Sequence, residues 1–304
     1  MEGQTPLLMK LTPFAAQKVW GGEYLKQKKS INSSVSIGET LEVSTLDNCN
    51  SSFQGTDLSE LVGSLSYLVK FIETTDNLSI QVHPDDDYAK LVENSLGKSE
   101  CWLILEANDG AGIYLGFRPG VTRNVFEKSI ANKEEINKLL NFYPVKRGDF
   151  FFVPAGAIHA IGANVILAEV QQSCGVTYRV WDWNRKGLDE KPRELHLEKA
   201  LDVIEFNQDK NAKPYFQFKE NILDKGDESL VSHKDFSFSV HRNKNTINVS
   251  RKGPSGILNF SKDPIKLVLN KSVVELQYLE SALVMPCDEK LKMEGSNRLI
   301  GMVC

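Results

Sequence analysis

Residues 148–159 read GDFFFVPAGAIH, and this stretch decides the fold. The run Gly148–Val153 is rich in aromatic residues and ends in a β-branched one, which is typical of a strand. Pro154 and Gly156 follow and favour a tight turn, because glycine adopts a positive φ without steric cost. His159 then falls on the returning strand, with its side chain directed into a closed sheet. The stretch predicts a strand, turn and strand that present a candidate metal ligand.

The spacing of glycine, proline and histidine in this stretch resembles the second metal-binding motif of cupins, which are small β-barrels that hold a metal ion. Ala163 stands where the motif's closing asparagine is expected, with Asn164 beside it. A weak internal repeat pairs residues 148–154 with residues 280–286. In this second copy Leu291 takes the place that corresponds to His159, so we expect no metal site there.

Short apolar runs bounded by Gly, Pro, Asn or Asp dominate the rest of the chain and predict strands at 66–73, 78–83, 101–105, 165–172 and 177–183. Helices are few, and periodicity predicts them at 85–95, 122–140 and 197–204. The polar stretch 207–214 is the best candidate for the boundary between two lobes of the chain. We therefore expect a mainly β, double-cupin fold with a small helical insertion. Residues 1–206 would form the metal-binding lobe, and residues 207–304 a degenerate lobe without metal ligands.

Composition narrows the classes of function. The 304 residues carry 36 basic and 40 acidic side chains, a net charge of −4, which gives no general attraction to nucleic acid or to an anionic membrane. No apolar run is long enough to span a bilayer, and the opening residues do not read as a secretory signal, so we expect a cytoplasmic protein. The five cysteines are widely spaced and odd in number, which argues against a disulfide framework.

Four polar residues are candidate metal ligands. Gln81 and His83 are two apart on a predicted strand, so both face one side. Glu100 opens the next strand and would point inward if Leu103 and Leu105 packed on the opposite layer. Gln81, His83 and Glu100 join His159 to give two imidazoles, a carboxylate and an amide oxygen, a set that suits zinc with one position open. Any one of them taken alone is explained more readily by a structural hydrogen bond than by metal binding.

Five motifs around these residues resemble type I phosphomannose isomerase in its short bacterial form: QVHPDD (81–86), GKSECW (97–102), PAGAIHAIG (154–162), LAEVQQ (167–172) and TYRVWDW (177–183). The resemblance implies an isomerase that interconverts mannose 6-phosphate and fructose 6-phosphate with one zinc ion per chain. It places the zinc ligands on Gln81, His83, Glu100 and His159, the catalytic arginine on Arg179, and a lysine and glutamate near the substrate on Lys98 and Glu169.

The division of roles stays open at this point. Glu169 is our first choice for the base that removes a proton from the sugar carbon, although it could instead orient a ligand histidine. Lys98 could hold the phosphate or protonate a sugar oxygen, and Arg185 or Arg193 could also meet the phosphate. Gly175 stands where many short-form members carry an acidic residue. One proposed acid or base is therefore missing here, which favours Glu169 for that role.

Other polar groups have structural explanations. Asp85, Asp86 and Asp87 precede a predicted helix, where carboxylates cap free N–H groups. His196, His233 and His241 are excluded from the predicted site. Two functions remain open. One is an isomerase whose reaction passes through an enediol, and the other is a non-catalytic cupin that binds and senses a sugar phosphate. A cupin dioxygenase is disfavoured because such sites usually have a histidine where Gln81 stands. The sequence leaves the oligomeric state open.

Overall fold

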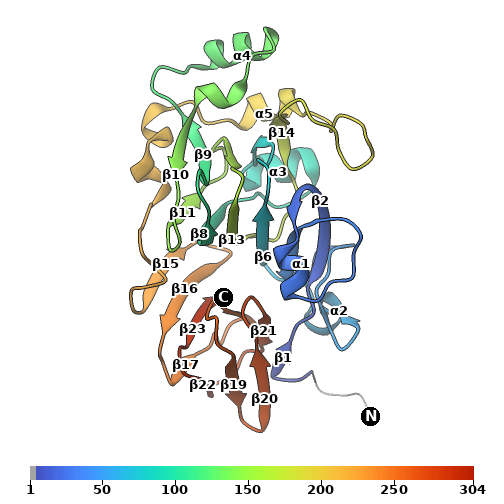
Figure 1. Cartoon of the computed structure of the whole chain (residues 1–304), viewed down its shortest axis with the longest axis vertical. Coiled ribbons are helices and arrows are strands. Elements are labelled where there is room, and N and C mark those ends of the chain that lie inside the picture. Colours follow the sequence, from blue (N-terminus) through green and yellow to red (C-terminus); the bar gives the residue numbers. More distant parts are fainter. Residues whose placement is uncertain (1–4) are drawn as a thin grey trace.

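The structure is a computed structural model that describes residues 5–304, and its sheets succeed one another along one long axis (Figure 1). A central six-stranded sheet has the order β11-β8-β13-β6-β3-β2, built from Phe150–Val153, Glu100–Ala107, Val165–Gln172, Tyr67–Thr74, Ile37–Val43 and Phe14–Gly22. Strands β11, β8, β13 and β6 contribute side chains to a core on each face of this sheet, which explains why they read as nearly continuous apolar runs.

Alternation along β8 sorts its side chains between two cores. Leu103 and Leu105 pack in the core that is shared with the C-terminal half of the chain, whereas Trp102 and Ile104 pack on the opposite face. Because strand side chains alternate, Glu100 shares the face of Trp102. This confirms the condition under which Glu100 was expected to point inward.

A five-stranded sheet covers this second face. Its order is β10-β9-β12-β7-β14, built from Leu140–Pro144, Gly112–Phe117, His159–Ile161, Ile80–Val82 and Tyr178–Trp181. Ile113 and Leu115 of β9 join Trp102 and Ile104 of β8 in one core. The candidate site lies between these two sheets.

The C-terminal half forms most of two more sheets, and its strands are drawn in orange and red in Figure 1, whereas β1, which joins one of these sheets, is blue. One has six strands in the order β1-β21-β18-β23-β16-β15, at Leu8–Lys10, Ser281–Val284, Ser255–Asn259, Leu299–Val303, Ser237–Arg242 and Glu228–Ser232. The other has the order β17-β22-β19-β20, at Thr246–Asn248, Lys290–Glu294, Ile265–Leu269 and Ser272–Leu276. Leu291 is buried in the core between them, so the place corresponding to His159 is apolar. The lobe boundary near residue 206 stays a prediction, and β1 crosses it to join the C-terminal sheet.

The helices are short: α1 (Tyr24–Lys28), α2 (Leu58–Val62), α3 (Asp86–Glu93), α4 (Arg123–Ala131), α5 (Leu197–Val203) and the 3₁₀ turns η1 (Ile136–Leu139), η2 (Gln208–Asn211) and η3 (Lys213–Phe216). A two-stranded ribbon joins β4 (Ser52–Phe53) to β5 (Thr56–Asp57). Within residues 5–304 the helices are all too short or too polar to cross a membrane.

Two predicted elements need correction. The expected helix over 122–140 is divided into α4 and η1, because Lys133 takes a positive φ of 56° that ends the helical path. The expected strand over 177–183 stops at Trp181, since Trp183 and Asn184 also have positive φ values, of 56° and 53°. The mainly β fold class is confirmed.

Candidate metal and substrate site

Three neighbouring strands align three of the predicted site residues in one row. His159 on β12 lies opposite Gln81 on β7, and Gln81 lies opposite Arg179 on β14. Directly opposed residues in an antiparallel sheet have side chains on the same face. The sequence places these residues far apart, and strand pairing brings them together.

Two further residues complete a buried cluster. His83 follows β7, and Glu100 comes from the facing sheet. One ligand atom from each of His83, Glu100 and His159 lies within 4.8 Å of the others, and all three side chains are buried. The Nε2 atoms of His83 and His159 lie 3.4 and 3.3 Å from the two Glu100 oxygens. The arrangement offers two nitrogens and a carboxylate to one point.

Backbone carbonyls orient both imidazole rings. Nδ1 of His83 is 3.0 Å from the carbonyl oxygen of Val176, and Nδ1 of His159 is 2.9 Å from that of Ala157. A carbonyl only accepts, so each Nδ1 carries the proton and each Nε2 keeps its lone pair. Metal-binding histidines are fixed in this way.

The turn between β11 and β12 ties one ligand to another. Gly156 has a φ of 84°, as the sequence pattern requires, and its N–H donates to the carbonyl oxygen of His83 at 2.9 Å. A Cβ atom at this position would lie 3.0 Å from the carbonyl oxygen of Val203. The glycine therefore fixes the turn that carries His159 and also holds the backbone of His83.

Charges in the cluster follow from burial and from Lys98. Burial first, and then the charge of Lys98, lower the pKa of His83 to about 3, and burial also lowers the pKa of His159. Burial alone would raise the pKa of Glu100, but Lys98 and the two histidines hold it well below its ordinary value. Neutral imidazoles and an ionised carboxylate are the forms that bind a metal.

The donor set fits a zinc ion. Lys98 Nζ lies 3.0 Å from a Glu100 oxygen as an ion pair, yet neither oxygen accepts a hydrogen bond from the described residues. Lys98 supplies a cation to one of these oxygens only, and a buried carboxylate oxygen without a donor is costly unless a further cation satisfies it. Gln81 contributes an amide, whose Nε2 is 3.3 Å from Nε2 of His159. Exchange of its amide oxygen and nitrogen would offer an oxygen to the same point.

A cavity of about 330 Å³ opens beside this cluster. Gln81 and Lys98 line this cavity, and each also contacts one of the buried histidines. Its charged lining consists of five basic side chains and two carboxylates: Lys18, Lys70, Lys98, Arg179, Arg193, Glu39 and Glu169. This excess of positive charge suits an anionic ligand.

Glu169 is buried on the cavity wall, with a hydrogen bond at one carboxylate oxygen and an ion pair at the other. Trp102 donates its Nε1–H to one oxygen at 3.1 Å, and Lys70 Nζ lies 3.1 Å from the other. Burial alone would lower the pKa of Lys70, but Glu169 and Glu39 raise it above its ordinary value. Lys70 is therefore an ammonium group, and its ion pair together with the hydrogen bond from Trp102 holds Glu169 in a fixed position.

Arg179 is half-buried and lies at the end of the row that it forms with Gln81 and His159. Its Nε donates to Ser79 Oγ at 3.2 Å, and its Nη1 donates to the carbonyl oxygen of Glu194 at 2.9 Å. Within residues 5–304 no carboxylate forms an ion pair with it. Its guanidinium group therefore brings an uncompensated positive charge to the cavity wall.

Some residues at the site differ from the sequence-based expectation. His196, which was excluded, lines the cavity, because its backbone N–H donates to the carbonyl oxygen of Arg179 at 2.7 Å. Lys70 and Glu39 were not singled out, although a charged residue inside an otherwise apolar strand was a usable signal. The capping role of Asp85 is confirmed, since its side chain accepts from the Tyr88 N–H at 2.9 Å.

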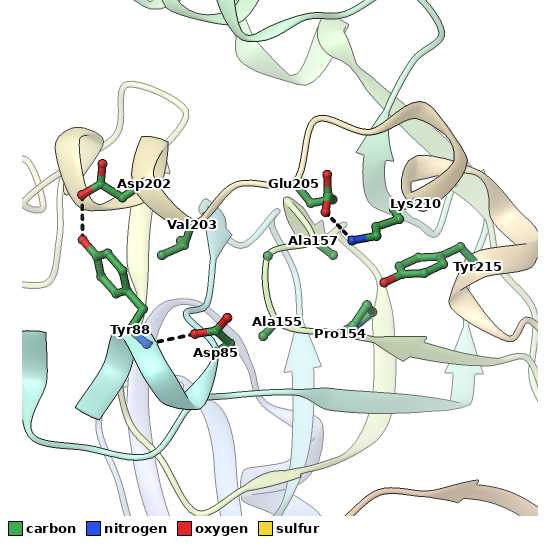
Figure 2. A pocket seen from close by; sticks show the side chains of 11 residues that line it. Asp85, Tyr88, Pro154, Ala155, Ala157, Asp202, Val203, Glu205, Lys210 and Tyr215 are labelled. Carbon is green, nitrogen blue, oxygen red and sulfur yellow. Dashed lines mark hydrogen bonds and ion pairs between the residues drawn. The ribbon is translucent and has the colours of Figure 1, made fainter. Parts of the chain in front are cut away.

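A second cavity, of about 270 Å³, is lined in part by the Pro154–Ala157 turn (Figure 2). Its polar groups already bind one another: Tyr88 donates its hydroxyl to Asp202, and Lys210 pairs with Glu205. Unlike the first cavity, it has no arginine or histidine of the described residues in its lining, so we place the site at the first.

The fold and the site together define a mainly β protein. It has a buried group of candidate metal ligands, His83, Glu100 and His159, which we call the metal-type cluster, and this cluster lies beside a cationic cavity. No family model matches the chain. It is 35% identical over 216 residues to a mannose-6-phosphate isomerase of Streptococcus mutans, covering 65% of this chain and 68% of that protein. It is 36% identical over 218 residues to the isomerase ManA of Bacillus subtilis, covering 66% and 68%. The chain belongs to the mannose-6-phosphate isomerase family.

Solved structures agree on the fold. A mannose 6-phosphate isomerase from Bacillus subtilis superposes with a TM-score of 0.83 at 24% identity, covering 98% of this chain and 99% of that one. A mannose 6-phosphate isomerase bound with zinc and yttrium superposes with a TM-score of 0.72 at 14% identity, covering 98% and 99%.

Proposed function

We propose that this protein interconverts mannose 6-phosphate and fructose 6-phosphate with one zinc ion held by Gln81, His83, Glu100 and His159. The observation that carries the proposal is the row His159, Gln81 and Arg179, which joins a metal-type cluster to a cationic cavity wall. Two histidines and a glutamate hold zinc in known catalytic sites. When bound, zinc would supply a Lewis acid beside the reacting carbonyl.

Arg179 would stabilise the negative charge of the reaction. Isomerisation moves a proton between C1 and C2 of the open-chain sugar through an enediol, and negative charge develops on the sugar oxygens. A guanidinium group that is permanently charged and already oriented by Ser79 and Glu194 can share this charge without reorganising. This role needs a cation without a carboxylate partner, as Arg179 is within the described chain.

Glu169 and Lys98 would move protons. Glu169 faces the cavity, and Lys70 pairs with its carboxylate form, which is the form that a base requires. Lys98 lies 3.1 Å from His83 Nε2 and lines the cavity, so its ammonium group is placed to donate a proton to a sugar oxygen. We assign the carbon proton to Glu169 and the oxygen proton to Lys98.

A coupled assay tests the proposal. Purified protein is stripped with a chelator, and fructose 6-phosphate formation from mannose 6-phosphate is followed before and after zinc is added. We expect turnover to vanish and then return. A folded, zinc-loaded protein that binds mannose 6-phosphate without turning it over would contradict the proposal and favour a sensing role.

A further inference from the structure

Two arginines meet at one part of the cavity wall. Arg179 and Arg193 both line it, Arg179 on β14 and Arg193 on the segment between β14 and α5. Both arginines line this one cavity, and the charge of Arg193 adds to burial in lowering the pKa of Arg179. Like charges brought together in this way favour an anion between them.

Asp182 fixes the orientation of Arg193. Its carboxylate is 6% exposed and accepts from Arg193 Nε at 2.6 Å and also from Arg193 Nη2, a two-point contact that sets the plane of the guanidinium group. The same carboxylate accepts from Arg185 Nε and Nη2 at 3.2 and 3.0 Å. Asp182 therefore divides one negative charge between two arginines, and Arg193 is not fully neutralised.

Within the described chain, each lysine of the cavity has a carboxylate partner that it shares with no arginine. Lys18 lies 3.5 Å from Glu39, Lys70 lies 3.1 Å from Glu169, and Lys98 lies 3.0 Å from Glu100. Each therefore faces its own carboxylate. The free positive charge of the cavity is concentrated at the two arginines.

This end of the cavity is separated from the metal-type cluster by one strand. Arg179 lies opposite Gln81, and the segment that carries Arg193 lies beyond Arg179, since the carbonyl oxygen of Glu194 accepts from Arg179 Nη1. A hexose 6-phosphate reacts at C1 and C2 and carries its phosphate at the far end of the carbon chain. A ligand with its reacting end at Gln81 would therefore extend toward Arg193.

We propose that Arg193, held by Asp182, is the anchor for the substrate's phosphate group and so selects phosphorylated over free sugars. This inference rests on the proposed isomerase function. It also resolves, in favour of Arg193, the choice between Arg185 and Arg193 that the sequence leaves open, because Arg185 points to Asp182 and Asp76 and does not line the cavity.

The test compares Arg193→Met with Arg185→Met, which removes the other arginine of the same carboxylate. We expect Arg193→Met to raise the KM for mannose 6-phosphate about tenfold or more, which is the usual scale of one lost charge-assisted hydrogen bond, and to change kcat little. Inhibition by inorganic phosphate should weaken to a similar extent. Arg185→Met should change both values far less, and Arg193→Lys should recover part of the loss.

Three results would overturn the inference: equal KM changes in Arg193→Met and Arg185→Met, unchanged inhibition by phosphate in Arg193→Met, or an equal loss of affinity for unphosphorylated mannose. Calorimetric titration with mannose 6-phosphate and with inorganic phosphate separates this inference from the isomerase proposal. If the wild-type protein binds both and Arg193→Met does not, the anchor is supported even without turnover. If Arg193→Met does not fold, Arg193→Lys takes its place in the comparison with Arg185→Met, with the same measurements of KM and phosphate binding.

Discussion

Arg179 and Gln81 lie directly opposite each other in the antiparallel pair of β14 and β7. This pairing places a permanent cation beside a candidate zinc ligand without any contribution from a flexible loop. Strands hold side chains more rigidly than loops do, which suits a site that must stabilise charge without reorganising.

The first prediction concerns Arg179 itself. Arg179→Ala should lower kcat by about 10²–10³, the usual cost of removing one stabilising donor from a developing oxyanion. Bound zinc, measured by elemental analysis, should stay at the wild-type level because Arg179 is not a ligand. Turnover at the wild-type rate in this variant would refute the assigned role.

The second prediction concerns the buried ion pair of Lys70 and Glu169. Lys70→Met leaves the carboxylate of Glu169 buried without its cation, so the free energy of unfolding should fall by about 3–5 kcal/mol in urea titrations. Lys70→Met combined with Glu169→Gln should recover a large part of this loss. If the double variant is as unstable as the sum of the single variants, the two residues are not coupled as the 3.1 Å contact indicates.

The third prediction separates two effects of Gly156. Gly156→Ala places an alanine at a positive φ and brings its Cβ to 3.0 Å from the carbonyl oxygen of Val203. Gly110→Ala is the matched control, because Gly110 has a similar φ of 78° and no atom within 4 Å of its added Cβ. The control should lose about 1–2 kcal/mol from backbone strain. Gly156→Ala should lose more and should also bind zinc more weakly; equal losses and unchanged zinc binding would contradict the role given to this turn.

The fourth prediction is a pH dependence of the metal-free protein. The folded chain keeps His83 neutral down to a pKa of about 3, whereas the unfolded chain takes up a proton near the ordinary value of 6.5. The unfolded state thus binds more protons between these values, and the free energy of unfolding should fall as the pH drops from about 6.5, by up to about 1.4 kcal/mol per pH unit. Urea titrations at pH 7.5, 6.5 and 5.5 measure this slope.

His83→Gln is the control for that slope. The variant has no imidazole at position 83, so its stability should depend less on pH over the same range. Identical slopes in the two proteins would show that the burial of His83 does not set the dependence.

Local patterns in the sequence predicted part of the site correctly. The alternation of Glu100 with Leu103 and Leu105 placed its carboxylate on the inner face, and the positive φ of Gly156 followed from the turn pattern. These features depend on neighbours within a few residues. The division of the helix at Lys133 was missed because an apolar period continued across the break.

Contacts between distant segments could not be predicted in the same way. The contacts of Lys70 and Trp102 with Glu169 depend on the pairing of β13 with both β6 and β8, which places these two residues opposite Glu169. The bond between Asp182 and Arg193 depends on how an irregular segment folds back on itself. Strand register and loop closure of this kind leave no short-range pattern in the sequence.

Zinc titration of the chelator-stripped protein is the measurement that tests the central proposal most directly. Isomerase activity on mannose 6-phosphate is recorded as zinc is added in fractions of one equivalent per chain, in the wild type and in Glu100→Ala. We predict a linear rise that ends at one zinc per chain in the wild type, and no rise over the same range in Glu100→Ala. Full activity in the stripped protein, or a Glu100→Ala titration that matches the wild type, would contradict a zinc-dependent reaction at this site.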